Sequence, residues 1–302
     1  MNRVLKPTPW LLLSITAVTL IGFPEGYSAQ ALAQAAKCQS HPPHLHANLW
    51  MQTSAEYQAL CWQTFSAALK EVRQAVKSAK RRGGRPTGPG KKPLAVVADL
   101  DETILDNARF QSEMDVAVML SCSDPGYTPG RWKQWERDNA DEVGLVPGAG
   151  PFVAEVERLK VVMVYISNRV EDLRASTIRS LANSGVNTQR LEDGLEPRLL
   201  LKRDTSDKQD RIRQAEEQYH VVAYLGDNLG DFPGAIAQST DVAGNLTNRL
   251  KKVEAAGNLW GTRWFMLPNP VYGDWDRALP DELAERLLFL KRASTPAFVE
   301  AK

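Results

Sequence analysis

The chain has 302 residues, of which 43% are hydrophobic and 24% are charged, an ordinary composition for a globular protein of one large domain or two small ones. Its formal net charge of +1 excludes a strongly basic protein, so we expect no nucleic-acid polymer as a partner.

The first 33 residues have the pattern of a secretory signal peptide. Residues 2–8 carry two basic residues and no acidic one, residues 10–23 form a mostly apolar run, and Ala31-Leu32-Ala33 resembles a cleavage site. The apolar run is short for a membrane-spanning helix, and an N-terminal membrane anchor remains the alternative. We therefore expect residues 1–33 to be removed near Ala33, which leaves a periplasmic or secreted protein without a stable membrane anchor.

Export would place the three cysteines, Cys38, Cys61 and Cys122, in an oxidising environment. Because three is an odd number, one cysteine must stay free or pair between chains, and the sequence leaves both arrangements open. Pairing between chains would produce a homo-oligomer, and the sequence leaves this arrangement open as well. Lys37 directly before Cys38 argues against lipid modification at that cysteine.

Residues 34–93 are predicted to form an N-terminal helical segment followed by a linker. Residues 53–56 have the pattern of a helix capping box, and the apolar residues after them recur every three or four positions, as on one face of a helix. These apolar residues are Tyr57, Leu60, Cys61, Phe65, Ala68, Leu69, Val72 and Val76. Residues 80–93 are rich in glycine, proline and basic side chains, which indicates irregular structure. His41, His44 and His46 precede the helix and are expected to belong to a flexible terminus.

Strands and helices alternate within residues 94–275, which predicts an α/β fold with a parallel sheet flanked by helices. The apolar runs expected to form buried strands are 94–98, 161–166, 199–201, 221–225 and 264–267, and the helical segments are 171–183 and 207–218. Residues 106–150 interrupt this alternation and are predicted to form a small cap. Residues 276–302 are predicted to form a helical tail.

Acidic residues follow the first and fourth predicted strands. Asp99 and Asp101 are two positions apart, so extended backbone places their side chains on the same face. One carboxylate can attack phosphorus while the other protonates the leaving oxygen. Asp227 and Asp231, with Asp99 and the backbone carbonyl of Asp101, offer the oxygen ligands that Mg²⁺ prefers. Because ligands bind beyond the carboxyl ends of parallel strands, we expect these four residues to meet there.

Two further polar residues suit a phosphoryl group. Ser167 ends the second predicted strand and offers a hydroxyl and an amide, and Lys208 offers a positive charge. Each motif alone is a common turn, helix start or surface residue, and their joint placement is what indicates a site. Together they predict a magnesium-dependent phosphate transfer through a phospho-aspartate.

Four segments resemble the haloacid-dehalogenase superfamily and, within it, the class C acid phosphatases, the lipoprotein acid phosphatase and 5′-nucleotidase family. They are Asp99-Leu100-Asp101-Glu102-Thr103, Ser167-Asn168-Arg169, Lys208, and Gly226-Asp227-Asn228-Leu229-Gly230-Asp231-Phe232. Residues 49–57 and 267–275 are similar to the family's first helix and C-terminal loop. The resemblance covers about residues 48–276 and implies a Rossmann-like core with a mainly helical cap.

The resemblance also implies roles for individual residues. It implies Asp99 as the nucleophile, Asp101 as the acid/base, and Lys208 as the lysine of the third motif. It implies magnesium held by Asp99, the carbonyl of Asp101 and Asp227, with Asp231 in support.

Substrate contacts are implied by the same resemblance. Trp132 in the cap and Tyr272 in the late loop match an aromatic pair that sandwiches a nucleotide base or nicotinamide ring, although simple packing remains an alternative for both. Thr103 and Asn168 belong to the matched motifs and are further predicted substrate contacts. Ile104 and residues 108–110 depart from the family's usual first-motif continuation.

The leading hypothesis is an exported, Mg²⁺-dependent acid phosphatase that hydrolyses small-molecule phosphomonoesters, 5′-nucleotides or nicotinamide mononucleotide, through a phospho-aspartate. Phosphotransfer to an alcohol acceptor through the same intermediate is the alternative. A non-catalytic binding or storage protein on the same scaffold is the alternative from another class. The presence of Asp99, Asp101, Lys208 and Asp227 argues against this last hypothesis.

Overall fold

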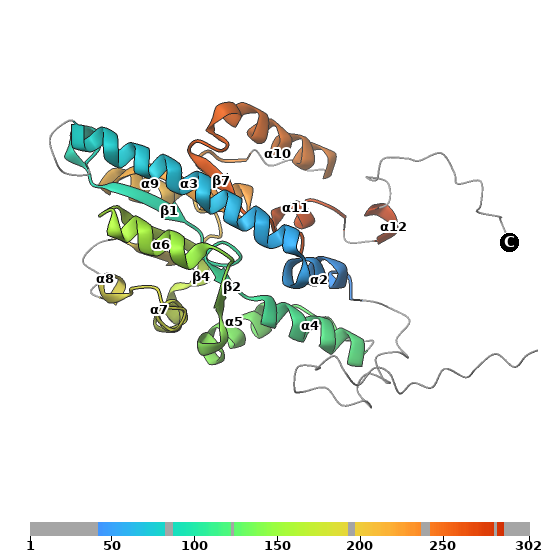
Figure 1. Cartoon of the computed structure of the whole chain (residues 1–302). Helices are drawn as coiled ribbons and strands as arrows, with labels where there is room; N and C mark the ends of the chain where they lie inside the picture. Colours follow the sequence, from blue (N-terminus) through green and yellow to red (C-terminus); the bar gives the residue numbers. More distant parts are fainter. Residues whose placement is uncertain are drawn as a thin grey trace, which may run out of the picture.

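The computed structural model describes residues 42–81, 87–121, 124–192, 197–236, 242–280 and 283–286 (Figure 1). The predicted signal peptide, Cys38, His41 and Cys122 lie outside these residues, as does most of the predicted tail. Within the tail the structure describes the end of α11 (Asp274–Arg277) and α12 (Leu283–Arg286). Among the described helices, none combines the length and apolar character needed to span a bilayer.

A five-stranded sheet in the order β5-β4-β1-β6-β7 lies at the centre of the fold, and all its neighbouring strands are parallel. The strands are β1 (Leu94–Ala98), β4 (Val162–Val170), β5 (Leu199–Lys202), β6 (His220–Gly226) and β7 (Trp264–Met266). The predicted α/β fold with a helix-flanked parallel sheet is confirmed. One strand is longer than predicted, since β4 continues to Val170 and Ser167, which was expected at its end, lies within it.

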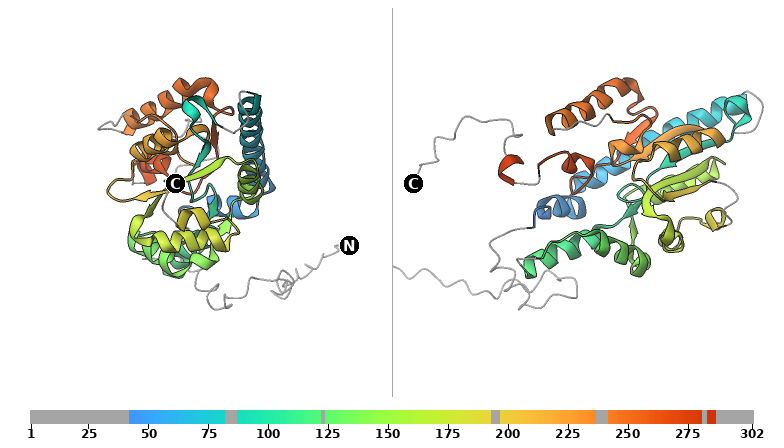
Figure 2. Two further views of the ribbon diagram at one scale, coloured as in Figure 1. Left: turned by 90° about the vertical axis from the view of Figure 1, so that its left-hand side faces the viewer. Right: turned by 180° about the vertical axis from the view of Figure 1, so that it is seen from behind.

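The side chains of β1 alternate between two apolar clusters, one on each face of the sheet. Leu94, Val96 and Ala98 belong to the cluster that includes residues of α3 and α6, whereas Ala95 and Val97 belong to the cluster that includes residues of α9. The bounds are α3 (Ala55–Arg81), α6 (Ala149–Arg158) and α9 (Gln209–Gln218). Figure 2 shows α9 on the side of the sheet away from α3. Burial on both faces explains why β1 is a continuous apolar run.

The N-terminal segment consists of two helices, α2 (Leu45–Thr53) and α3, where one was predicted. Ser54 lies between them, and its Oγ accepts a hydrogen bond from the backbone N–H of Tyr57 at 3.1 Å. Ser54 is therefore the residue that caps α3, one position after the predicted Thr53. The buried face of α3 is Tyr57, Cys61, Phe65, Ala68, Val72, Val76 and Ala79. Leu60, which was expected on this face, is 41% exposed.

Residues 106–150, the cap segment, lie mostly outside the sheet. A short antiparallel pair of strands, β2 (Leu105–Asp106) and β3 (Gly144–Leu145), brackets α4 (Ala108–Leu120) and α5 (Pro129–Asp138). The ring of Phe110 on α4 lies 5.1 Å from that of Trp132 and 5.7 Å from that of Trp135 on α5, measured between centroids. These aromatic contacts hold the two helices together beside the sheet's carboxyl edge.

Candidate active site

The first acidic motif lies at the middle of the sheet's carboxyl edge. Asp99 follows β1, and its backbone N–H donates to the carbonyl oxygen of Leu225 on β6 at 3.0 Å. Because β1 has β4 on one side and β6 on the other, the chain leaves β1 at the point where the strand order reverses. Ligands of parallel α/β sheets bind at such a point.

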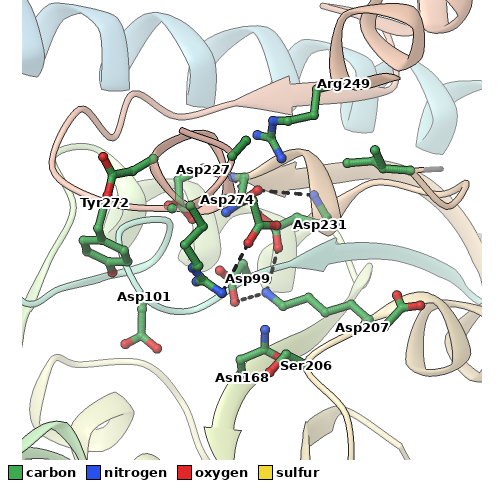
Figure 3. A pocket seen from close by; sticks show the side chains of 18 of the residues that line it. Asp99, Asp101, Asn168, Ser206, Asp207, Asp227, Asp231, Arg249, Tyr272 and Asp274 are labelled. Carbon is green, nitrogen blue, oxygen red and sulfur yellow. Dashed lines mark hydrogen bonds and ion pairs between the residues drawn. The ribbon is translucent and has the colours of Figure 1, made fainter. Parts of the chain in front are cut away.

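Three carboxylates converge there (Figure 3). Asp99, Asp227 and Asp231 each offer an oxygen, and the three oxygens lie within 4.8 Å of one another. Asp231 is held in place by the backbone N–H of Asn228, which donates to its Oδ2 at 2.8 Å. A Cβ atom at position 226 would collide with Asp231, so glycine is required at the end of β6.

Lys208 connects two of these carboxylates. Its Nζ lies 2.6 Å from Oδ1 of Asp99 and 2.7 Å from Oδ1 of Asp231, and the side chain of Lys208 is only 6% exposed. Burial acts against the charge of this ammonium, but attraction to Asp231 and Asp99 outweighs burial and raises the pKa of Lys208. Lys208 is therefore a fixed positive charge next to Asp99 and Asp231. We call the group formed by Asp99, Asp227, Asp231 and Lys208 the floor of the site.

The carboxylates carry more negative charge than Lys208 balances. Burial raises the pKa of Asp99 well above its usual range; Lys208 opposes this shift, and repulsion from Asp231 and Asp227 adds to it. Burial and repulsion from Asp231 likewise raise the pKa of Asp227 to about 7. Three converging carboxylate oxygens, two of them from buried residues, form a ligand set that fits a hard divalent cation such as Mg²⁺.

Two polar side chains hold Asp227. Nδ2 of Asn269 donates to its Oδ2 at 2.8 Å, and Oγ1 of Thr103 donates to its Oδ1 at 3.2 Å. Thr103 is 0% exposed and does not line the cavity. The hydroxyl of Thr103 is buried and directed at Asp227, so its contact with substrate stays a prediction that this geometry does not support.

Asp101 stands apart from the three carboxylates, on the side of the site that faces the cap segment. Its Oδ1 accepts hydrogen bonds at 2.9 Å from Nε of Arg169 and from Nδ2 of Asn107, and lies 2.8 Å from Nη2 of Arg169. The side chain of Arg169 is 0% exposed, whereas that of Asp101 is 16% exposed and lines the cavity. A buried guanidinium thus orients a carboxylate that a substrate can still reach.

The polar residues of β4 occupy different positions. Ser167 is 0% exposed, its Oγ accepts the backbone N–H of Arg169 at 3.1 Å, and it is not among the residues that line the cavity. The neighbouring Asn168 does line it, and its Oδ1 accepts from Nη2 of Arg211 at 2.7 Å. Ser167 is thus buried away from the cavity surface, and its contact with a phosphoryl group stays a prediction, whereas Asn168 is already accessible.

The site lies in a cavity of about 870 Å³ whose walls come from several elements. Trp132 lines it from the cap segment and Tyr272 from the loop after β7, so both predicted aromatic residues face the same space. Trp132 also packs against Phe110, and the guanidinium of Arg169 lies 5.7 Å from the centre of its ring. His44, which was expected in a flexible terminus, also lines the cavity.

Several residues at or next to the site have no predicted role. Arg169 and Asn269 lie inside segments that were matched to the family, so a signal for them was present. Arg211 and Glu136 carry no local signal. Glu136 on α5 is 2% exposed, and neither of its carboxylate oxygens has a hydrogen-bond partner among the described residues. Burial and repulsion from Asp101 raise the pKa of Glu136 to about 7.

Comparisons with known proteins agree with this geometry. Residues 25–275 match the family model described as HAD superfamily, subfamily IIIB (acid phosphatase). The chain is similar to a structure of the class C acid phosphatase from Bacillus anthracis with tungstate bound, at 28% identity and a TM-score of 0.66, covering 83% of this chain and 98% of that chain. For another structure of that enzyme the identity is 28%, the TM-score is 0.63, and the covered shares are 78% and 87%. The chain therefore belongs to subfamily IIIB of the HAD superfamily, the acid phosphatases, and is a phosphomonoester hydrolase.

Proposed function

We propose that this acid phosphatase is exported, depends on Mg²⁺ and hydrolyses 5′-nucleotides or nicotinamide mononucleotide through a phospho-aspartate at Asp99. The observation that carries the proposal is the meeting of Asp99, Asp227, Asp231 and Lys208 on the floor of one cavity, with Asp101 beside them.

In the first step a carboxylate oxygen of Asp99 attacks phosphorus, and the bond between phosphorus and the ester oxygen breaks. Asp101, in its protonated form, transfers its proton to that ester oxygen, and the alcohol leaves. In the second step the Asp101 carboxylate takes a proton from a water molecule, whose oxygen attacks the same phosphorus. The bond to Asp99 breaks, which releases inorganic phosphate and restores both carboxyl groups.

The remaining residues position these groups. Asp99, Asp227 and the backbone carbonyl of Asp101 would hold Mg²⁺, with Asp231 in support, and the bound cation would neutralise the repulsion between the phosphate and the carboxylates. Asn269 fixes the orientation of Asp227. Lys208 holds Asp99 through an ion pair and adds a positive charge where phosphoryl oxygens arrive. Asn168 is available for a further contact with those oxygens.

The proposed substrate class follows from the walls of the cavity. A volume of about 870 Å³ accommodates a leaving group much larger than the phosphate itself. Trp132 and Tyr272 line it, and an aromatic face accepts any planar ring, because stacking depends little on the ring's substituents. Nucleotide bases and the nicotinamide ring both meet this requirement.

The decisive experiment compares Asp99→Asn with the wild type in turnover of p-nitrophenyl phosphate at saturating Mg²⁺. We expect the variant to lose essentially all turnover, because an amide cannot act as the nucleophile, and EDTA to abolish wild-type turnover until Mg²⁺ is restored. Asp204→Asn, at an exposed aspartate between β5 and α9, is the isosteric control. Turnover retained by Asp99→Asn would refute the mechanism.

Two further measurements test the finer parts of the proposal. Product analysis in the presence of glycerol or a nucleoside separates hydrolysis from phosphotransfer, because only hydrolysis gives equal amounts of phosphate and alcohol. N-terminal sequencing of protein recovered from a periplasmic extract tests export, with a mature chain that begins near residue 34 as the expected result. A full-length chain in that extract would contradict cleavage.

A further inference from the structure

Arg249 enters the cavity from a direction that the proposed mechanism does not use. It lies on α10 (Val242–Ala256), lines the same cavity as Asp99, and in Figure 3 points toward the carboxylates from the side opposite Asp101. The catalytic groups described above follow the ends of β1 and β6, and Lys208 directly precedes α9. Arg249 therefore forms a separate part of the cavity wall.

Arg249 differs from two other cationic side chains of the cavity, Lys208 and Lys252, in its contacts with the described residues. Lys208 is paired with two carboxylates, and the Nζ of Lys252 donates to three backbone carbonyls, at 2.6 Å to Gly234 and 2.7 Å to Leu229 among them. Arg249 makes no hydrogen bond or ion pair with any residue that the structure describes. Its guanidinium therefore has up to five N–H donors available to a ligand.

The surroundings of Arg249 favour an added anion. Its side chain is half-buried, and burial lowers the pKa of the guanidinium; attraction to Asp274 opposes this shift, and repulsion from Arg277 adds to it. Asp274 is already engaged by Arg277, since its Oδ1 lies 3.4 Å from Nη1 of that residue. A half-buried guanidinium beside a second guanidinium gains free energy when a ligand brings a negative charge.

We propose that Arg249 forms a subsite for a second phosphate group on the substrate, so that bisphosphorylated small molecules are preferred over monophosphates of the same skeleton. This inference rests on the proposed function, because one phosphate must occupy the site at Asp99 while the other reaches Arg249. Arginine suits this task because its planar fork of donors can bind two phosphate oxygens at once.

The test compares adenosine 3′,5′-bisphosphate with adenosine 5′-monophosphate as substrates, at low ionic strength and saturating Mg²⁺. The measured quantity is the ratio of the two kcat/KM values, with products separated by chromatography to identify which phosphate is released. We expect the wild type to prefer the bisphosphate by roughly tenfold, and Arg249→Ala to lower this ratio by about the same factor. Arg249→Lys should keep part of the preference, because it keeps the charge without the fork.

Lys251→Ala is the matched control, because it removes one positive charge from the exposed face of the same helix and does not line the cavity. It should leave the ratio unchanged. Equal loss on both substrates in Arg249→Ala, or no loss on either, would overturn the subsite while leaving the phosphatase function intact. Failure of the wild type to hydrolyse p-nitrophenyl phosphate or either nucleotide would overturn the proposed function, and the subsite with it.

Discussion

The floor of the cavity and its cap-side wall hold buried charge in different ways. On the floor, Lys208 forms ion pairs of 2.6 and 2.7 Å with Asp99 and Asp231. Behind the wall, the buried Arg169 binds Asp101, but the neighbouring Glu136 has no hydrogen-bond partner for either carboxylate oxygen among the described residues. The floor thus holds its carboxylates by ion pairs and hydrogen bonds, whereas the carboxyl group of Glu136, which lies behind the wall and does not line the cavity, is held by neither among the described residues.

The largest effect that separates the two regions is expected from Asp101→Asn. This change should lower kcat by about 10²- to 10⁴-fold for an alkyl phosphate such as glycerol phosphate, because a poor leaving group needs the proton that Asp101 supplies. For p-nitrophenyl phosphate, whose leaving group departs as an anion, the loss should be much smaller. Steady-state kinetics on both substrates measure the difference. Equal losses on the two would show that Asp101 is not the general acid.

The next effect concerns the floor alone. Asn269→Ala removes the amide that donates to Asp227 at 2.8 Å, and we expect the Mg²⁺ concentration for half-maximal activity to rise by roughly 10- to 100-fold. At saturating Mg²⁺ the activity should largely return. Thr103→Val, which removes the weaker contact of 3.2 Å with little change in side-chain shape, should shift the Mg²⁺ requirement less. A loss that Mg²⁺ cannot restore would assign Asn269 a different role.

The sequence predicts most of the floor, because its residues follow elements with a strong local signal. The apolar runs before Asp99 and Asp227 are buried on both faces of the sheet, and parallel strands present their carboxyl ends to one edge. The structure brings Asp99, Asp227 and Asp231 together, with Lys208 between two of them, whereas Asp101, the fourth residue expected there, stands apart from this cluster. The burial of Ser167 is not predicted by the sequence, because a serine that follows an apolar run can be buried or exposed depending on tertiary packing.

Glu136 and Arg249 are harder to predict, because their burial depends on contacts with elements far away in the sequence. Glu136 belongs to a segment rich in charged residues, and its burial arises because α5 packs against α7 (Arg174–Asn183), nearly forty residues later in the chain. Arg249 likewise lies on a helix that carries two further basic residues, Lys251 and Lys252. Neither burial nor exposure of such residues follows from spacing alone, since both depend on tertiary packing.

The Glu136→Gln variant tests this comparison through the pH dependence of the free energy of unfolding. Because the pKa of Glu136 in the folded protein is raised to about 7, the folded state binds this proton more tightly than the unfolded state. Binding of this proton stabilises the folded state. The stabilisation is fully present below about pH 4.5 and is lost as the pH rises through 7, and the total loss in free energy of unfolding is up to about 3 kcal/mol. The variant should therefore gain in free energy of unfolding relative to the wild type between pH 5 and pH 8.

Chemical denaturation at several pH values measures this gain. Glu254→Gln, at an exposed glutamate on α10, is the control and should show no such trend. Parallel pH profiles for the wild type and Glu136→Gln would show that Glu136 keeps one protonation state across this range.

The smallest effect is expected at the outer part of the wall. Trp132→Ala should raise KM for adenosine 5′-monophosphate by about three- to tenfold, because it removes one face on which the base can stack, and Trp132→Phe should raise it less. Glycerol phosphate, which has no ring, separates the two explanations for Trp132. If its KM rises equally, the tryptophan acts by packing on Phe110 and Arg169, and its removal disturbs Asp101 through that arginine. If only the nucleotide is affected, Trp132 contacts the substrate directly, and the cap segment contributes to specificity.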